Sequence, residues 1–326
     1  MKKRTLINAA KRQLPGLETR VSSPEKTEKG FPVSLLKSAT QKAIRRGDIG
    51  RALRSAKSWL HKKPNDFFRR LPIMILEDAI LHPDFRKAVE LAGHSARKAF
   101  VVTKEIEHFA LTIIEQLAKI EVRDYSFVAY NNGFKSINIV PYVDWKELKK
   151  PARETVMAIK WREKMSGMKD DMNMLSFLTR IWAHRFKEKI FTMSKLKALY
   201  DKIPTRKSYA SIPTTLTVND ILLEAVDYHA SPMVDILANK RYVRNLVERH
   251  YPNDVITLEE RLESIIWRMR SGINYKKDIF SGEPIDWLKE PFNRTPNADR
   301  ERYDSIYASL EPEINNISLW FLEKNK

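Results

Sequence analysis

The chain has 326 residues, a formal net charge of +18, 43% hydrophobic residues, no cysteine and 9 glycines. The length allows one large or two ordinary domains, and the absence of cysteine excludes a disulfide framework, a cysteine-ligated zinc site and a thiolate nucleophile. So few glycines argue against a turn-rich β fold. The sequence therefore predicts a mainly α, multi-helix globular protein.

The positive charge is concentrated in the N-terminal part of the chain. Residues 1–30 contain 8 basic and 3 acidic residues, and residues 37–70 contain 11 basic and 2 acidic residues. Local positive fields attract polyanions and raise encounter rates. We therefore predict a nucleic-acid-binding surface made of these residues: Lys37, Lys42, Arg45, Arg46, Arg51, Arg54, Lys57, Lys62, Lys63, Arg69 and Arg70. The alternative is a solvated helix face kept soluble by lysine and arginine.

The first predicted elements follow from local signals. Residues 1–30 are polar and lack a sustained hydrophobic period, so we expect a flexible basic arm. A first helix is expected from Ser34 to Gly47, because glycine favours the position after a helix. Asp48 then caps a second helix, whose apolar residues recur every three or four positions. Arg51 and Arg54 fall on its opposite face, as a helix that docks on a polyanion requires.

A third helix is predicted from Phe67 to about Leu81, with Pro72 kinking it or starting a new turn. Residues 84–119 predict one or two further helices. β-branched and aromatic residues surround Asn132 and Gly133, which predicts a short β-hairpin near 125–143. A loop between two helical halves is the alternative for this segment.

The remaining helices are separated by a segment without periodicity. Residues 202–219 contain two prolines and many serines and threonines, which predicts a linker or a surface loop. Helices are expected near 145–148, 153–165, 172–189, 220–240, 258–271 and 299–323. The chain thus divides into a flexible basic arm at 1–30, a basic helical domain at 31–123, a hairpin with helices at 124–201, the linker or loop at 202–219 and a C-terminal helical region at 220–326.

No nucleotide-binding loop and no hydrolase motif occurs in the sequence. This favours a non-enzymatic protein without a cofactor or a metal. Two carboxylate clusters would nevertheless suit a metal if they were close in space; they are Glu77, Asp78 and Asp84 with His82, and Asp170 with Asp171. The alternative is that the first cluster pairs with Arg69 and Arg70 and that the second caps the following helix.

Aromatic residues are interleaved with basic ones at Trp59, at Phe67-Phe68 and at Trp161. Stacking on exposed aromatic rings, together with phosphate contacts, is how proteins hold single strands. At helical spacing the alternative is burial in the core, and exposure distinguishes the two.

One segment, from Leu36 to Asp84, carries a recognisable series of residues. The series is Lys42-Ala43-Ile44-Arg45, Asp48, Ala52-Leu53, Trp59-Leu60, Arg69-Arg70-Leu71, Glu77-Asp78 and Pro83. It resembles the helical region that follows the ATPase core in clamp-loader-like replication-recombination ATPases, the Werner-helicase-interacting-protein family. The turn at 165–171 is similar to one in the same family. The resemblance implies a helical, oligomerising assembly beside DNA, although this chain lacks the ATPase core.

Together these observations predict a cytoplasmic protein (of the host cytoplasm if it is viral) that binds DNA or RNA in replication, recombination or transcription. The expected partners are nucleic acid, replication proteins and a second copy of the chain. A membrane is not expected, because no stretch approaches the roughly 18 apolar residues of a span. The alternatives are a metal-dependent nuclease or other nucleic-acid enzyme that uses the carboxylate clusters, and an oligomerising module that docks on an acidic protein.

Overall fold

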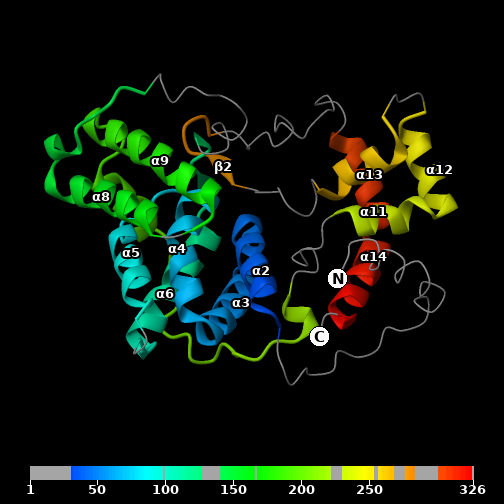
Figure 1. The fold of residues 1–326 in the computed structure, drawn as a ribbon, viewed down its shortest axis with the longest axis horizontal. Coiled ribbons are helices and arrows are strands. Elements are labelled where there is room, and N and C mark those ends of the chain that lie inside the picture. Colours follow the sequence, from blue (N-terminus) through cyan, green and yellow to red (C-terminus); the bar gives the residue numbers. More distant parts are fainter. Residues whose placement is uncertain are drawn as a thin grey trace. The chain divides into compact units, whose positions relative to one another are not determined.

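The computed structural model describes residues 31–97, 100–126, 140–165, 167–221, 230–252, 256–267, 276–282 and 300–324. These residues form twelve α-helices, two short 3-10 helices and one pair of two-residue strands (Figure 1). The prediction of a mainly α protein is confirmed. The predicted arm at 1–30 and most of the predicted hairpin, at 127–139, lie outside the described residues. None of the described helices is long and apolar enough to span a bilayer.

The chain forms two compact units, and each is built from segments that are separate in the sequence. The large unit comprises Ala43–Thr215 and Asn274–Ile285. The small unit takes its described residues from Met1–Lys42, Leu216–Ile273 and Asp286–Lys326. The chain leaves the large unit at the end of the predicted linker or loop, whereas the predicted boundary between 123 and 124 lies inside the large unit.

Stacked helices make up the large unit. They are the end of α2 (Val33–Arg46), α3 (Ile49–Lys62), α4 (Pro64–Asp78), α5 (Phe85–His94), α6 (Lys104–Lys119), α8 (Lys150–Lys164), α9 (Lys169–Lys187) and α10 (Met193–Asp201), with a 3-10 turn at Trp145–Glu147. Helix α3 packs on α4 and α6, α4 packs on α5, α5 packs on α8, and α8 packs on α9 (Figure 1). Trp59, Phe67 and Phe68 are fully buried in this core, and their rings meet edge to face.

The predicted junction between the first two helices is confirmed. Helix α2 ends at Arg46, and Gly47 follows it with a φ of 71°, in the left-handed region that favours glycine. The side chain of Asp48 accepts a hydrogen bond of 3.0 Å from the backbone N–H of Arg51, which caps α3.

The predicted bounds of other helices need correction. Helix α4 begins at Pro64 rather than Phe67, because proline fits the first turn of a helix, and Pro72 lies inside it without ending it. Helix α9 begins at Lys169, after Met168, so Asp170 and Asp171 lie in its first turn instead of capping it. Helix α10 was not predicted by the sequence patterns.

A segment from far along the chain completes the large unit. Strand β1 (Val122–Arg123) pairs in parallel with strand β2 (Lys277–Asp278). The buried ammonium of Lys276 donates hydrogen bonds to the backbone oxygens of Leu117 at 2.7 Å and Ile120 at 2.8 Å. The end of α6 thereby gains donors for carbonyls that its own helix leaves unpaired. Burial lowers the pKa of Lys276 to about 7.

The small unit has a hydrophobic core of its own. Its helices are α11 (Ala230–Ala238), α12 (Arg241–His250), α13 (Leu258–Trp267) and α14 (Arg300–Lys324), with a 3-10 turn at Val218–Asp220. Helix α11 packs on α13, and α12 contacts α11, α13 and α14. Buried residues of all four helices form one cluster, among them Leu237, Val243, Leu262 and Ile314. The predicted helix at 299–323 is confirmed, whereas α12 was not predicted.

We predict that Lys276→Met removes part of the pH dependence of stability. The pKa of Lys276 falls from 10.5 to about 7 on folding, so between these values the unfolded chain binds one more proton. The penalty for burying the charge is complete below pH 7 and disappears as the pH rises. This contributes a gain in unfolding free energy of about 1.4 kcal/mol per pH unit. Urea unfolding at pH 7, 8 and 9 should show a smaller gain in the variant, and equal gains would contradict the prediction.

Candidate nucleic-acid interface

The predicted basic residues differ widely in exposure. Lys62 and Lys63 are exposed, and Lys57 is buried. The others are half-buried; they are Lys37, Lys42, Arg45, Arg46, Arg51, Arg54, Arg69 and Arg70. Lys37 and Lys42 belong to the small unit and the rest to the large unit. The eleven residues therefore do not form one uniform surface.

Helix α3 has the two-sided character that its sequence predicts. Ala52, Leu53, Ala56 and Leu60 are buried along one side. Arg51, Arg54 and Lys62 lie on the less buried side, and Arg51 forms an ion pair of 2.9 Å with Asp48. We call Arg51, Arg54, Lys62 and the adjoining Lys63 the α3 face.

Lys57 does not belong to the predicted surface, because its side chain is buried and binds a loop to α3. Its ammonium donates a hydrogen bond of 2.9 Å to the backbone oxygen of Tyr209 and lies 3.3 Å from a carboxylate oxygen of Glu107. The hydroxyl of Tyr209 donates a hydrogen bond of 2.7 Å to Glu115. The segment predicted as a linker or loop is thus attached to α3 and α6 through Tyr209, which is itself buried.

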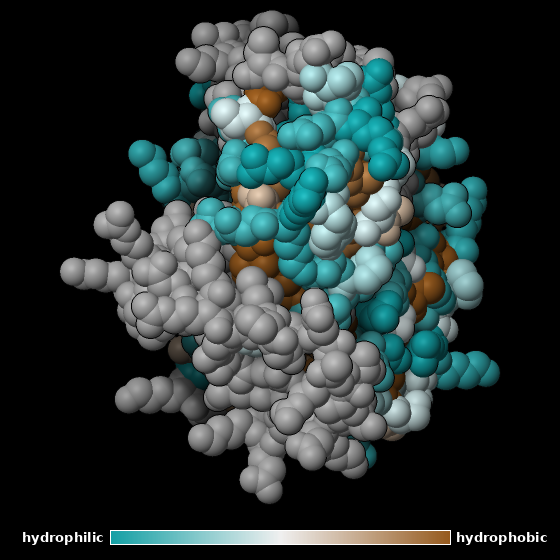
Figure 2. All heavy atoms as spheres, turned by 90° about the vertical axis from the view of Figure 1, so that its right-hand side faces the viewer, coloured by the Kyte–Doolittle hydropathy of each residue, from teal (hydrophilic) through white to brown (hydrophobic). Residues whose placement is uncertain are grey.

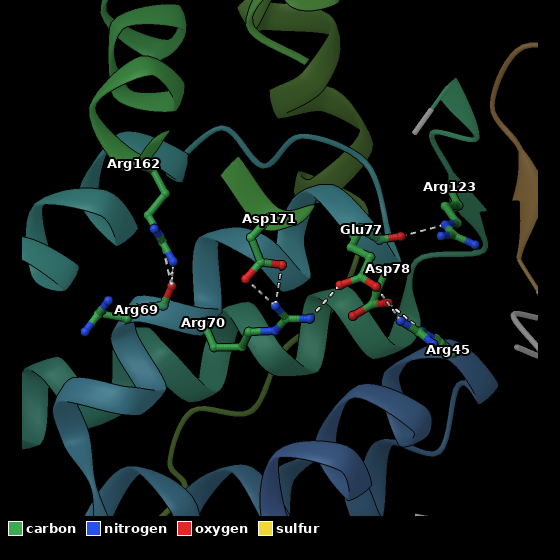
Figure 3. A network of polar contacts seen from close by, with 8 residues as sticks. All are labelled: Arg45, Arg69, Arg70, Glu77, Asp78, Arg123, Arg162 and Asp171. Atoms are coloured by element: carbon green, nitrogen blue, oxygen red, sulfur yellow. Dashed lines mark hydrogen bonds and ion pairs between the residues drawn. The ribbon is translucent and has the colours of Figure 1, made fainter. Parts of the chain in front are cut away.

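Two of the predicted arginines belong to a row of ion pairs that connects α2, α4 and α9 (Figure 3). Arg45 donates hydrogen bonds to Asp78 at 2.6 Å and to one oxygen of Glu77 at 2.9 Å. Arg70 donates to the other oxygen of Glu77 at 2.9 Å and to Asp171 at 2.8 Å. Charges of opposite sign thus alternate along the row. We call these five residues the ion-pair network.

Burial sets the protonation behaviour of the ion-pair network. Desolvation raises the pKa of the fully buried Asp78, against the opposing effect of Arg45. Desolvation alone would lower the pKa of Arg70, but the charges of Glu77 and Asp171 raise it above its ordinary value. Arg70 is therefore a permanent cation at the centre of the network.

The two carboxylate clusters do meet in space, and an arginine lies where a metal would have to bind. Glu77 from the first cluster and Asp171 from the second both accept hydrogen bonds from Arg70. His82 instead bonds Gln116 at 3.0 Å and accepts the backbone N–H of Asp84. Within the part of the chain that the structure describes, no group of three or more histidine, aspartate and glutamate residues is arranged to hold a metal. The geometry favours ion pairing as the role of these carboxylates.

Arg162 joins α8 to the same region of α4. Its Nε and Nη2 donate to the backbone oxygen of Arg69 at 2.9 and 2.7 Å (Figure 3). Pro72 has no backbone N–H, so the carbonyl of Phe68, which precedes Arg69, lacks its usual donor from within the helix. Burial lowers the pKa of Arg162 to about 10, with the positive charges of Arg69 and Arg70 acting in the same direction and the negative charge of Asp171 opposing them.

Exposure separates the aromatic residues that the sequence singles out. Trp59, Phe67 and Phe68 are fully buried, so they belong to the core. Trp161 is 56% exposed on α8, beside the exposed Lys160. Of these aromatic residues, Trp161 alone is placed to stack on a ligand.

No protein-family model, no curated protein and no solved structure matches the chain. The resemblance of Leu36–Asp84 to the Werner-helicase-interacting-protein family therefore stays a prediction.

We predict that Arg70→Met lowers the unfolding free energy by about 3–5 kcal/mol, because it leaves Glu77 and Asp171 without the cation between them. Arg180 is exposed on α9, so Arg180→Met should change the unfolding free energy by less than about 0.5 kcal/mol. Adding Asp171→Asn to Arg70→Met should recover part of the loss. Urea unfolding measures all three, and an Arg70→Met protein as stable as the unaltered chain would contradict the assignment.

Proposed function

We propose that the chain is a non-enzymatic nucleic-acid-binding protein that contacts phosphates through the α3 face. The observation that supports this most directly concerns the acidic residues of the described segment up to Asp78. None of these carboxylates is exposed, and each one accepts hydrogen bonds from within the protein. They are Asp48, Asp66, Glu77 and Asp78.

Because these carboxylates are held within the protein, the α3 face presents basic side chains to solvent. Asp48 caps α3, and Asp66 accepts a hydrogen bond of 3.0 Å from the indole N–H of Trp59. Internal contacts also take up Arg45, Lys57 and Arg70. Residues 49–63 contain no aspartate or glutamate, so the charged side chains that α3 and Lys63 direct to solvent are lysine and arginine.

Such a surface suits phosphate contacts without base reading. Lysine and arginine contacts to phosphates supply most non-specific affinity, and the release of counterions makes that affinity fall steeply with salt. DNA and RNA both satisfy this chemistry. A cytoplasmic location and a role in replication, recombination or transcription stay part of the proposal.

Two other functions remain as outcomes of the test. An oligomerising module that docks on an acidic protein would use the same positive charge. A metal-dependent nuclease has less support, because Arg70 bridges the carboxylate clusters that it would need.

We predict that Lys62→Glu/Lys63→Glu weakens binding to nucleic acid about tenfold at 100 mM salt. Fluorescence anisotropy with labelled 20-mers of single-stranded DNA, duplex DNA and RNA measures the affinity. For four phosphate contacts, the affinity of the unaltered chain should fall about a hundredfold between 50 and 200 mM salt. Arg51→Glu/Arg54→Glu should weaken binding in the same direction.

Lys149→Glu/Lys150→Glu is the matched control, because it changes the net charge equally at two exposed lysines outside the α3 face. It should bind within about twofold of the unaltered chain. An affinity independent of salt, or an equal loss in the control, would contradict the proposal. A protein partner that stays bound after nuclease treatment would favour the docking module, and strand cleavage with Mg²⁺ would favour the nuclease.

A further inference from the structure

A second basic surface lies in the small unit, on helix α12. Six of its side chains are exposed, namely Arg241, Tyr242, Arg244, Asn245, Glu248 and Arg249. Val243 and Val247 are buried on the opposite side. Three arginines thus share the exposed side with a single carboxylate, so its charge is positive. Helix α12 lies toward the viewer in Figure 2, on a side where hydrophilic residues predominate among the described ones.

The arginines of this surface differ from those of the ion-pair network. Within the described part of the chain, the side chains of Arg241, Arg244 and Arg249 have no ion-pair or hydrogen-bond partner. Arg45 and Arg70, by contrast, are held by carboxylates. The charge on α12 is therefore available to an outside partner, and it suits a polyanion.

Helix α12 is also firmly held from behind. Val243 and Val247 belong to the core cluster that α11, α13 and α14 complete. Lys240, which precedes the helix, pairs with Glu313 of α14 at 2.5 Å. Tyr242 is 47% exposed, and its hydroxyl donates a hydrogen bond to Glu313. The partial burial of the ring and the negative charge of Glu313 both raise the pKa of Tyr242. A helix fixed in this way presents its outer side chains without a prior rearrangement.

The connection between α11 and α12 suggests how duplex DNA would meet this surface. Helix α11 ends at Ala238 and α12 begins at Arg241, so a tight turn joins the two. In helix-turn-helix proteins the second helix lies in the major groove, and its first residues contact base edges. An α-helix with its side chains is about 10–12 Å wide, which matches the roughly 12 Å of that groove. Arginine and asparagine, as at 241, 244 and 245, pair with guanine and adenine edges.

We infer that α12 enters the major groove of double-stranded DNA, with Arg241, Arg244 and Arg249 on its phosphates and base edges. This adds a second contact to the proposed function, on a surface of the other unit, and names duplex DNA as its ligand. It does not require the α3 face.

The test compares duplex DNA with duplex RNA of the same sequence, by anisotropy with the full chain. Arg241→Ala/Arg244→Ala/Arg249→Ala should weaken binding to a 20-base-pair DNA duplex about tenfold or more, and should reduce the salt slope by about 2 to 3. Binding to the RNA duplex should change little, because the major groove of A-form RNA is too narrow for a helix. Lys146→Ala/Lys149→Ala/Lys150→Ala removes the same charge elsewhere and should bind DNA within about twofold.

Glu248→Gln should change the affinity for DNA in the opposite direction. Removing the one carboxylate of the exposed side should tighten DNA binding about twofold to threefold, because it no longer repels phosphates. This variant keeps the inference falsifiable if the triple variant loses its helical circular dichroism. Weaker DNA binding by Glu248→Gln would overturn the inference.

The remaining outcomes separate the two surfaces. Unchanged DNA binding by the triple arginine variant, or an equal loss on RNA, would overturn the role of α12. Lys62→Glu/Lys63→Glu is measured in the same series. If only the α12 variant loses affinity, the inference stands and the proposed role of the α3 face fails; if only the α3 variant does, the reverse holds.

Discussion

A carboxylate that is removed from water must be surrounded by cations and hydrogen-bond donors, and Asp78 imposes this condition on the large unit. Asp78 ends α4 and is fully buried. Arg45, at the end of α2, reaches it and also Glu77, and Arg70 continues the row to Asp171 on α9. Every member of the row except the two ends holds two partners. The relative placement of three helices that are distant in the sequence therefore depends on one continuous set of charges.

A second kind of contact recurs in the large unit: a buried side-chain donor binds a backbone carbonyl that is far away in the sequence. Lys57 binds the carbonyl of Tyr209, Lys276 binds two carbonyls at the end of α6, and Arg162 binds that of Arg69. The hydroxyl of Tyr200 donates to the carbonyl of Ile80 at 2.6 Å in the same way. The oxygens of Tyr209, Ile80 and Ile120 lie outside helices and that of Leu117 in the last turn of α6, where a helix supplies no donor, whereas Arg162 adds donors to a carbonyl inside α4. These contacts also mean that part of the net charge of +18 is structural and does not contribute to the surface.

The predictable parts of the fold are those in which neighbouring residues carry the information. Gly47 and Asp48 mark a helix junction by their own conformational and capping preferences, and the apolar stripe of α3 repeats within a few residues. The partner of Arg70 is different, because Asp171 is 101 positions away and any carboxylate would look equally suitable from the sequence. Strands of two residues carry no alternation to detect. Helix α12 was not predicted, although it does carry a helical signal, because Val243, Leu246 and Val247 recur at i, i+3 and i+4.

The candidate site follows the same division. The concentration of basic residues and the outward side of α3 could be predicted from spacing alone. Carboxylates and carbonyls of distant segments decide which of those residues are buried. Lys57 is an example, because it binds the carbonyl of Tyr209. The exposure of Trp161, and the burial of Trp59 in a similar sequence context, were equally beyond local patterns.

The pairing of β1 with β2 bears on the order in which the chain folds as it leaves the ribosome. Met1–Lys42 of the small unit emerge before Ala43–Thr215 of the large unit, which also needs the later Asn274–Ile285, because these bring Lys276 to the end of α6. Leu216–Ile273 emerge in between and belong to the small unit, which in turn waits for α14. Domains that are continuous in sequence are finished one after another during synthesis. Here the segments of the two units alternate along the chain, so neither unit is completed before part of the other has been synthesised.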